Sequence, residues 1–86
     1  MTLRYTAHAL ERIDQMALSR STVERVALDP DLEYPGNPRR IPDARCAVRD
    51  GIVVVWVPDH YDPAAKCVVT VLWDKAEGRD EMGAPA

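Results

Sequence analysis

Residues 45–57 read RCAVRDGIVVVWV, and this stretch decides the fold that the rest of the sequence predicts. Arg45, Ala47 and Arg49 alternate with Cys46 and Val48, as in a strand. Asp50-Gly51 then supplies the two positive-φ positions of a type I′ turn, and a Val-rich run follows from Ile52 to Val57. The pattern predicts a hairpin that pairs residue 45 with 56, 47 with 54 and 49 with 52. Arg45 and Arg49 then lie on the same face of the sheet.

Two helices are predicted before this hairpin. Apolar residues recur at helical spacing from Ala9 to Ala17, and Thr6 is a candidate N-cap. A second, shorter helix begins after Ser19 or Ser21, because either serine has the spacing of a capping residue. Pro30 disfavours helix at the residue before it, so this element ends at Asp29-Pro30.

The remaining strands are predicted on both sides of the hairpin. Residues 31–42 contain three prolines and form a loop or a broken edge strand, whereas Lys66 to Trp73 form a further strand. With at best a short strand at the N-terminus, the order predicts an α+β fold: two N-terminal helices packed on a three- to four-stranded antiparallel sheet. Residues 1–74 are expected to form one domain, and residues 75–86 a flexible tail.

Composition limits the function classes. A chain of 86 residues with 47% apolar and 29% charged residues has the balance of a single folded domain. The formal net charge of -3 excludes a global positive field that would attract nucleic acid, so a local basic patch would have to do so. One such patch is present, because Tyr34 to Arg49 holds four arginines against one aspartate.

The sequence predicts a cytoplasmic protein. The longest apolar run, Ile52 to Val57, is far shorter than the roughly 20 residues of a membrane span, so no membrane partner is expected. The first residues lack the apolar segment of a signal peptide. Cys46 and Cys67 are therefore expected to be reduced thiols rather than a disulfide.

Several segments together resemble a small bacterial and phage family, domain of unknown function 4258. They are the run YTAHALERI at residues 5–13, the helix start at Ser19, the stop at Asp29-Pro30 and the strand VVTVLW at residues 68–73. The resemblance implies the barnase, EndoU, colicin and RelE-like fold, which includes ribonuclease toxins that need no metal or other cofactor. It further implies RNA as substrate and a neutralising antitoxin protein as partner. Where family members often carry a second arginine, this chain reads DQMA at residues 14–17.

Residue chemistry supports the same hypothesis. In metal-free RNA cleavage a base removes the ribose 2′-hydroxyl proton, an acid protonates the leaving oxygen, and cations stabilise the charged intermediate. His8 and Arg12 are four residues apart, so on a helix they reach one ligand, His8 as the base or acid and Arg12 as a phosphate binder. The other candidate phosphate-binding residues are Arg39, Arg40, Arg45 and Arg49.

Each assignment has a structural alternative. His8 and Arg12 could be a solvated helix face or pair with Glu11 or Asp14, and Arg45 could form a cation-π pair with Trp56. At the level of the whole chain, the acidic balance and the missing arginine favour a non-catalytic interaction module. Such a module would form a homodimer or dock a partner protein. A third hypothesis is a phage or toxin-system accessory protein, an antitoxin-like inhibitor whose acidic surface imitates nucleic acid.

Two further residues are weaker candidates for the site. Tyr61 is a general acid or a loop anchor on the sheet edge, and Thr70 either bonds a neighbouring strand or points into the cleft. Asp59, His60 and Asp62 lie in one loop but lack a fourth ligand at a predictable spacing, so no metal site is predicted.

Overall fold

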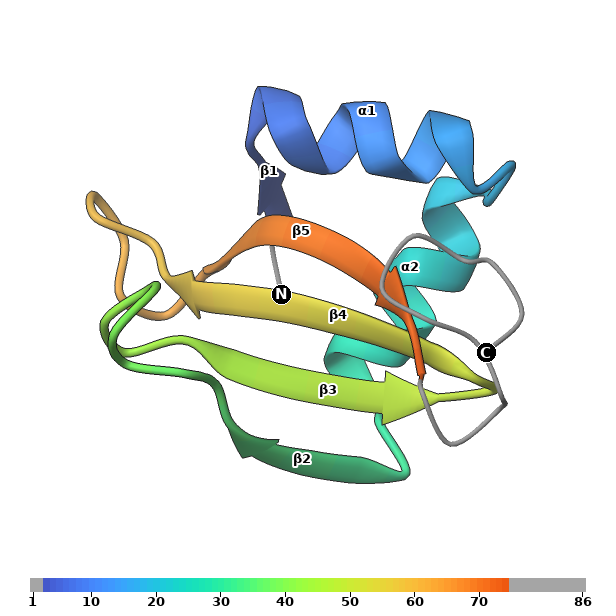
Figure 1. The fold of residues 1–86 in the computed structure, drawn as a ribbon. Helices are drawn as coiled ribbons and strands as arrows, with labels where there is room; N and C mark the ends of the chain where they lie inside the picture. Colours follow the sequence, from blue (N-terminus) through green and yellow to red (C-terminus); the bar gives the residue numbers. More distant parts are fainter. Residues whose placement is uncertain (1–2, 75–86) are drawn as a thin grey trace.

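The computed structural model describes residues 3–74, and these form an α+β fold (Figure 1). The elements in chain order are β1 (Leu3–Tyr5), α1 (Ala7–Gln15), α2 (Arg20–Leu28), β2 (Leu32–Pro35), β3 (Arg45–Arg49), β4 (Ile52–Pro58) and β5 (Lys66–Trp73). The fold class predicted from the sequence is confirmed. The predicted tail at residues 75–86 lies outside the described residues.

The hairpin between β3 and β4 has the predicted register. Arg45 pairs with Trp56, Ala47 with Val54 and Arg49 with Ile52. Asp50 and Gly51 both have positive φ, at 54° and 76°, as a type I′ turn requires. This turn fixes the register, and with it which residues of β3 share a face with which residues of β4.

The sheet itself differs from the prediction of three to four antiparallel strands, which is wrong. It has five strands in the order β1-β5-β4-β3-β2, and it is mixed because β1 pairs with β5 in parallel. Leu3–Tyr5 is too short for a periodic signal, and a parallel partner distant in sequence leaves no turn motif to read. The Pro-rich segment does supply an edge strand, β2, where Pro35 is tolerated at the end.

Both helices begin at side-chain caps. The Thr6 side chain accepts a hydrogen bond from the Ala9 amide, and the Ser19 side chain accepts one from the Thr22 amide, so Ser19 rather than Ser21 caps the second helix. Figure 1 shows α2 behind the sheet and α1 along its β5 side. Neither nine-residue helix of the described chain is long and apolar enough to cross a membrane.

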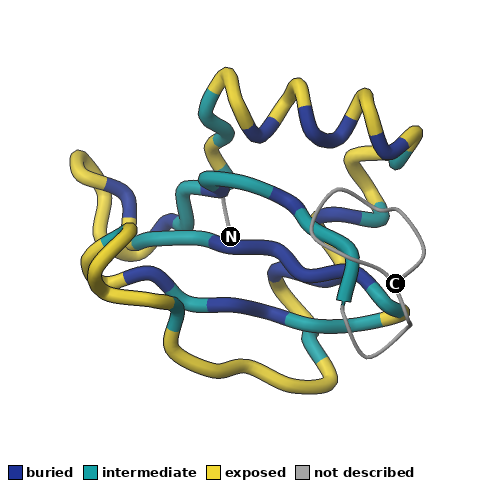
Figure 2. The backbone as a smooth tube through the Cα atoms, in the orientation of Figure 1, coloured by how far each residue is buried: buried dark blue, intermediate teal, exposed yellow. Residues whose placement is uncertain are grey.

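The main core lies between the helices and one face of the sheet. Its buried residues are Ala9, Ile13, Met16, Val23, Val26, Ala27, Ala47, Ile52, Val54, Val68 and Val71. In Figure 2 the buried positions of α1 face the sheet, whereas β2 is exposed along its length. A smaller cluster on the opposite face contains Ala44, Cys46, Val53 and Val55. The sheet is thus apolar on both faces, and α2 covers only one.

Helix α1 follows β1 along the same side of β5 and supplies hydrogen-bond donors where β1 ends. Because β1 pairs only with Lys66 to Val68, the next carbonyl groups of β5 need other donors. The amide and hydroxyl of Thr6 donate to the carbonyl oxygens of Val68 and Val69, at 3.0 and 2.9 Å. Arg12 Nε donates to the carbonyl of Val71 at 3.1 Å. These bonds hold α1 where its polar side reaches the sheet face away from α2.

Candidate functional site

A pocket of about 530 Å³ opens on the sheet face away from α2. Three segments line it: His8, Arg12 and Gln15 of α1; Gly36, Asn37, Arg40, Ile41 and Ala44 between β2 and β3; and Cys46, Val55, Thr70 and Leu72 of the sheet. Pockets for small ligands commonly have volumes of roughly 300 to 1,000 Å³. The space therefore suits a ligand about the size of one nucleotide.

His8 and Arg12 line the pocket together, as their spacing predicts. His8 is exposed and makes no hydrogen bond or ion pair within the described chain, so its imidazole is available to a ligand. Arg12 is only 7% exposed. Besides its bond to Val71, it donates to the side-chain oxygen of Gln15 at 3.2 Å and to the sulfur of Met16 at 3.9 Å. Its charge is thus fixed at the pocket wall.

Arg40 and Thr70 complete the polar lining. Arg40 is exposed on a compact loop, in which the amides of Arg40 and Ile41 both donate to the Asn37 carbonyl at 3.1 Å. Thr70 lies on the pocket face of β5, opposite Val55, so the alternative in which it points into the cleft is the one observed. Its hydroxyl oxygen is buried and has no hydrogen-bond partner in the described chain. A buried hydroxyl without a partner is costly, and a ligand would satisfy it.

The described lining of the pocket carries positive charge, although the chain is negative overall. This described lining contains two arginines and no aspartate or glutamate, whereas the formal net charge of the chain is -3. Glu11 and Asp14 belong to α1 but do not line the pocket. Ile41, Val55 and Leu72 supply an apolar wall. Cationic and apolar surfaces in one space suit a ligand that has both a phosphate and a planar ring.

Three of the predicted phosphate-binding arginines do not line the pocket. Arg39 is exposed on the loop beside Arg40. The register of β3 turns Arg45 and Arg49 toward the α2 side of the sheet, the side of their neighbour Ala47.

Both of these strand arginines form ion pairs with carboxylates outside the pocket lining. Arg45 pairs with Glu33 at 3.3 Å, and Arg49 pairs with Asp29 at 2.8 Å. The cation over the Trp56 ring is Lys66, at 4.3 Å from its centroid, rather than Arg45 as the alternative had it. The structure therefore does not bring Arg45 and Arg49 together with His8 and Arg12.

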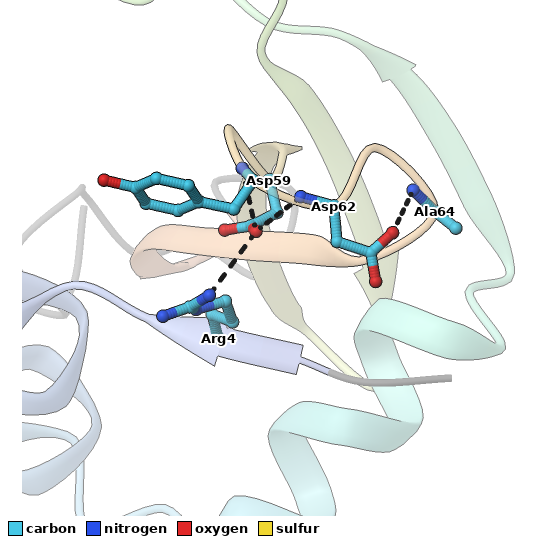
Figure 3. Close-up of polar contacts among 5 residues, drawn as sticks. Arg4, Asp59, Asp62 and Ala64 are labelled. Carbon is cyan, nitrogen blue, oxygen red and sulfur yellow. Dashed lines mark hydrogen bonds and ion pairs between the residues drawn. The ribbon is translucent and has the colours of Figure 1, made fainter.

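The loop between β4 and β5 carries Tyr61 and the acidic residues considered for a metal. Asp59 is buried and turned into its own loop, where its carboxylate accepts hydrogen bonds from the amides of Tyr61 and Asp62 at 3.2 and 3.0 Å and pairs with Arg4 at 3.6 Å (Figure 3). Within residues 3–74, no group of three or more ligating side chains could hold a metal ion. Tyr61 is 83% exposed, and its ring centroid lies 5.9 Å from Arg4 Cζ of the edge strand β1.

Sequence reasoning missed several lining residues, including Gln15, Asn37 and Cys46. Gly36-Asn37 is a turn signal from which a loop here could have been predicted. The position of this loop over the sheet depends on the hydrogen bond from the Gly36 amide to the Ala44 carbonyl, at 2.8 Å, which the sequence does not reveal. Cys46 is a free thiol, and burial raises its pKa while a hydrogen bond with Tyr34 lowers it.

Comparison with known proteins adds no function to this geometry. No family model, curated protein or solved structure matches the chain. The chemistry of the pocket is therefore the basis for a functional proposal.

Proposed function

We propose that this protein is a metal-independent endoribonuclease of the toxin type that cuts unpaired RNA in the pocket. The observation that carries the proposal is the convergence of His8, Arg12, Arg40 and Thr70 on one space whose described lining has no carboxylate. The resemblance of residues 5–13 to domain of unknown function 4258 supports it, because that run contains both His8 and Arg12.

The reaction follows from these groups. His8 takes the proton of a ribose 2′-hydroxyl, the freed oxygen attacks the adjacent phosphorus, and the bond from phosphorus to the 5′ oxygen breaks. The products are a 2′,3′-cyclic phosphate and a 5′-hydroxyl, whose proton comes from water. Arg12 and Arg40 stabilise the charge that develops on the phosphate oxygens, and the Thr70 hydroxyl donates to one of them.

The substrate class follows from the shape of the pocket. A base that lies against Ile41, Val55 and Leu72 is enclosed and cannot keep a paired partner. DNA lacks the 2′-hydroxyl that acts as nucleophile. The expected substrate is thus single-stranded RNA, and the same sequence as DNA binds without being cut.

The test is incubation of the purified protein with unstructured RNA in EDTA. We expect cleavage that leaves a cyclic phosphate, and loss of cleavage in His8→Gln without loss of stability, since His8 has no partner in the described chain. Glu11→Gln is the control on the same helix, because Glu11 is exposed and does not line the pocket, and it should cut normally. RNA left intact by the wild type would refute the proposal, as would full activity in His8→Gln.

The second candidate is a non-catalytic module that binds a phosphate-bearing ligand or a partner protein. Two observations favour this candidate. Arg12 has a structural role through its bonds to Val71, Gln15 and Met16. Arg45 and Arg49 form ion pairs elsewhere and do not line the pocket. A module for a phosphate-bearing ligand would bind the RNA in EDTA without cutting it, and a module for a partner protein would leave the RNA unbound. On the toxin proposal, a neutralising protein would cover the pocket, whereas a homodimer belongs to the module alternative.

A further inference from the structure

A second polar and aromatic group lies on the pocket face of the sheet, at the β1 edge. Leu3 and Tyr5 pack against the helix-side core, so Arg4 between them points to the opposite face. Arg4 pairs with Cys67 of β5 in the sheet register. The loop after β4 brings Tyr61 to this position, and Arg4 Cζ lies 5.9 Å from the centroid of the Tyr61 ring.

The loop holds Tyr61 in place although its side chain is solvated. Hydrogen bonds join the Asp59 amide to the Ala65 carbonyl at 3.0 Å and the Ala65 amide to the Asp62 carbonyl at 2.8 Å. The Asp59 carboxylate accepts from the amides of Tyr61 and Asp62, and that of Asp62 accepts from the Ala64 amide at 3.1 Å (Figure 3). An aromatic ring that is 83% exposed on so closely bonded a loop is presented to solvent at little entropic cost.

The surroundings of the ring suit an uncharged planar ligand. Arg4 contacts the ring as a cation, and the His60 and Tyr61 rings form a T-shaped pair with 5.1 Å between centroids. The Arg4 side chain is 56% exposed, and its ion-pair partner Asp59 is 7% exposed. With Asp59 and Asp62 in the same loop, the charge here does not favour a phosphate. A nucleobase stacks on tyrosine through its π face and needs no net charge.

We propose that Arg4 and Tyr61 form a stacking platform for a base of the same unpaired RNA strand whose neighbouring nucleotide occupies the pocket. This inference rests on the proposed function, since it assigns a second contact to that substrate. His8 follows β1 closely, in the first turn of α1, so a strand that leaves the pocket at His8 meets the β1 edge. The platform makes affinity depend on strand length and on unpaired bases.

The test measures binding without cleavage, using a 2′-O-methyl oligonucleotide of about four nucleotides and, separately, uridine 3′-monophosphate. For the oligonucleotide, we expect Tyr61→Ala to raise the Kd about tenfold, within the range for loss of one base stack, and Tyr61→Phe to change it less than about twofold. For the mononucleotide, which fills only the pocket, Tyr61→Ala should leave the Kd unchanged.

Three outcomes would overturn the platform: no binding of the oligonucleotide by the wild type, an unchanged oligonucleotide Kd in Tyr61→Ala, or equal losses for both ligands. Cleavage of unmodified RNA by the wild type is scored separately. Cleavage with Tyr61-independent binding refutes the platform alone. Tyr61-dependent binding without cleavage supports the platform and refutes the ribonuclease proposal.

Discussion

Arg12 Nε donates a hydrogen bond to the main-chain carbonyl oxygen of Val71 at 3.1 Å, across 59 residues of sequence. Val71 lies on the half of β5 that β1 does not reach, so this bond takes the place of a strand partner. The same guanidinium lines the pocket. One side chain therefore joins α1 to the sheet and places a positive charge where a phosphate would bind.

Arg12→Ala should lower the free energy of unfolding by about 2 kcal/mol, because the buried Val71 carbonyl loses a charged donor. Arg12→Lys should recover part of the loss, since an ammonium group keeps the charge but not the geometry of the guanidinium. Urea denaturation measures both values. A loss below about 0.5 kcal/mol in Arg12→Ala would show that the bond does not hold the helix.

Arg39 and Arg40 are a matched pair, because both are exposed on one loop and only Arg40 lines the pocket. Arg40→Ala should weaken binding of non-cleavable RNA and reduce the slope of log K against log salt by about 1, as loss of one phosphate contact does. Arg39→Ala should leave both nearly unchanged. Fluorescence anisotropy over a salt series measures them, and equal effects of the two substitutions would contradict the assignment of Arg40.

Thr70→Val tests the buried hydroxyl on the pocket floor. Removing a hydroxyl that has no partner in the described chain should leave the free energy of unfolding unchanged or raise it by up to about 1 kcal/mol. RNA cleavage should nevertheless fall, by about tenfold in kcat/KM, if the hydroxyl donates to the reacting phosphate. Thr70→Ser should restore cleavage. Normal cleavage by Thr70→Val would remove Thr70 from the site.

Cys46 reports on occupancy of the pocket. Burial raises the pKa of its thiol, and the thiolate is the reactive form, so alkylation by iodoacetamide should be slow at neutral pH and should accelerate only at a higher pH than for an exposed thiol. Uridine 3′-monophosphate should slow the reaction further by covering Cys46. A Cys67→Ser background isolates this rate, which mass spectrometry can follow. An identical rate with and without the nucleotide would place the ligand elsewhere.

Local chemistry explains which parts of the fold could be predicted from sequence. The Asp50-Gly51 turn, the cap at Thr6 and the Asp29-Pro30 stop each act within a few residues, and all three are observed. The parallel pairing of β1 depends on contact between residues more than 60 positions apart, such as Leu3 and Lys66. No local pattern encodes such a contact, so the mixed sheet could not be derived.

The candidate site also has features that local sequence predicts and features that depend on long-range packing. His8 and Arg12 share a side because helical spacing requires it. The hairpin register correctly predicted that Arg45 and Arg49 share a face, but which face meets α2 depends on where the helices pack. The face that Thr70 occupies depends on the irregularity between Val55 and Trp56, because it shifts the pairing of β4 with β5, and the sequence does not show it. The sequence therefore predicts which side chains could bind or react with a ligand. It does not predict which face of the sheet each of them occupies.

The pocket draws its walls from α1 and the 36–44 segment, and part of its floor from β5. While the chain is being synthesised on a ribosome, His8 and Arg12 emerge early, but Thr70 and the Val71 carbonyl that positions Arg12 emerge late. A nascent chain that ends before β5 therefore carries the imidazole without the surface that aligns a phosphate beside it. On the ribonuclease proposal, this order of assembly would spare the messenger being translated until the strand has been added.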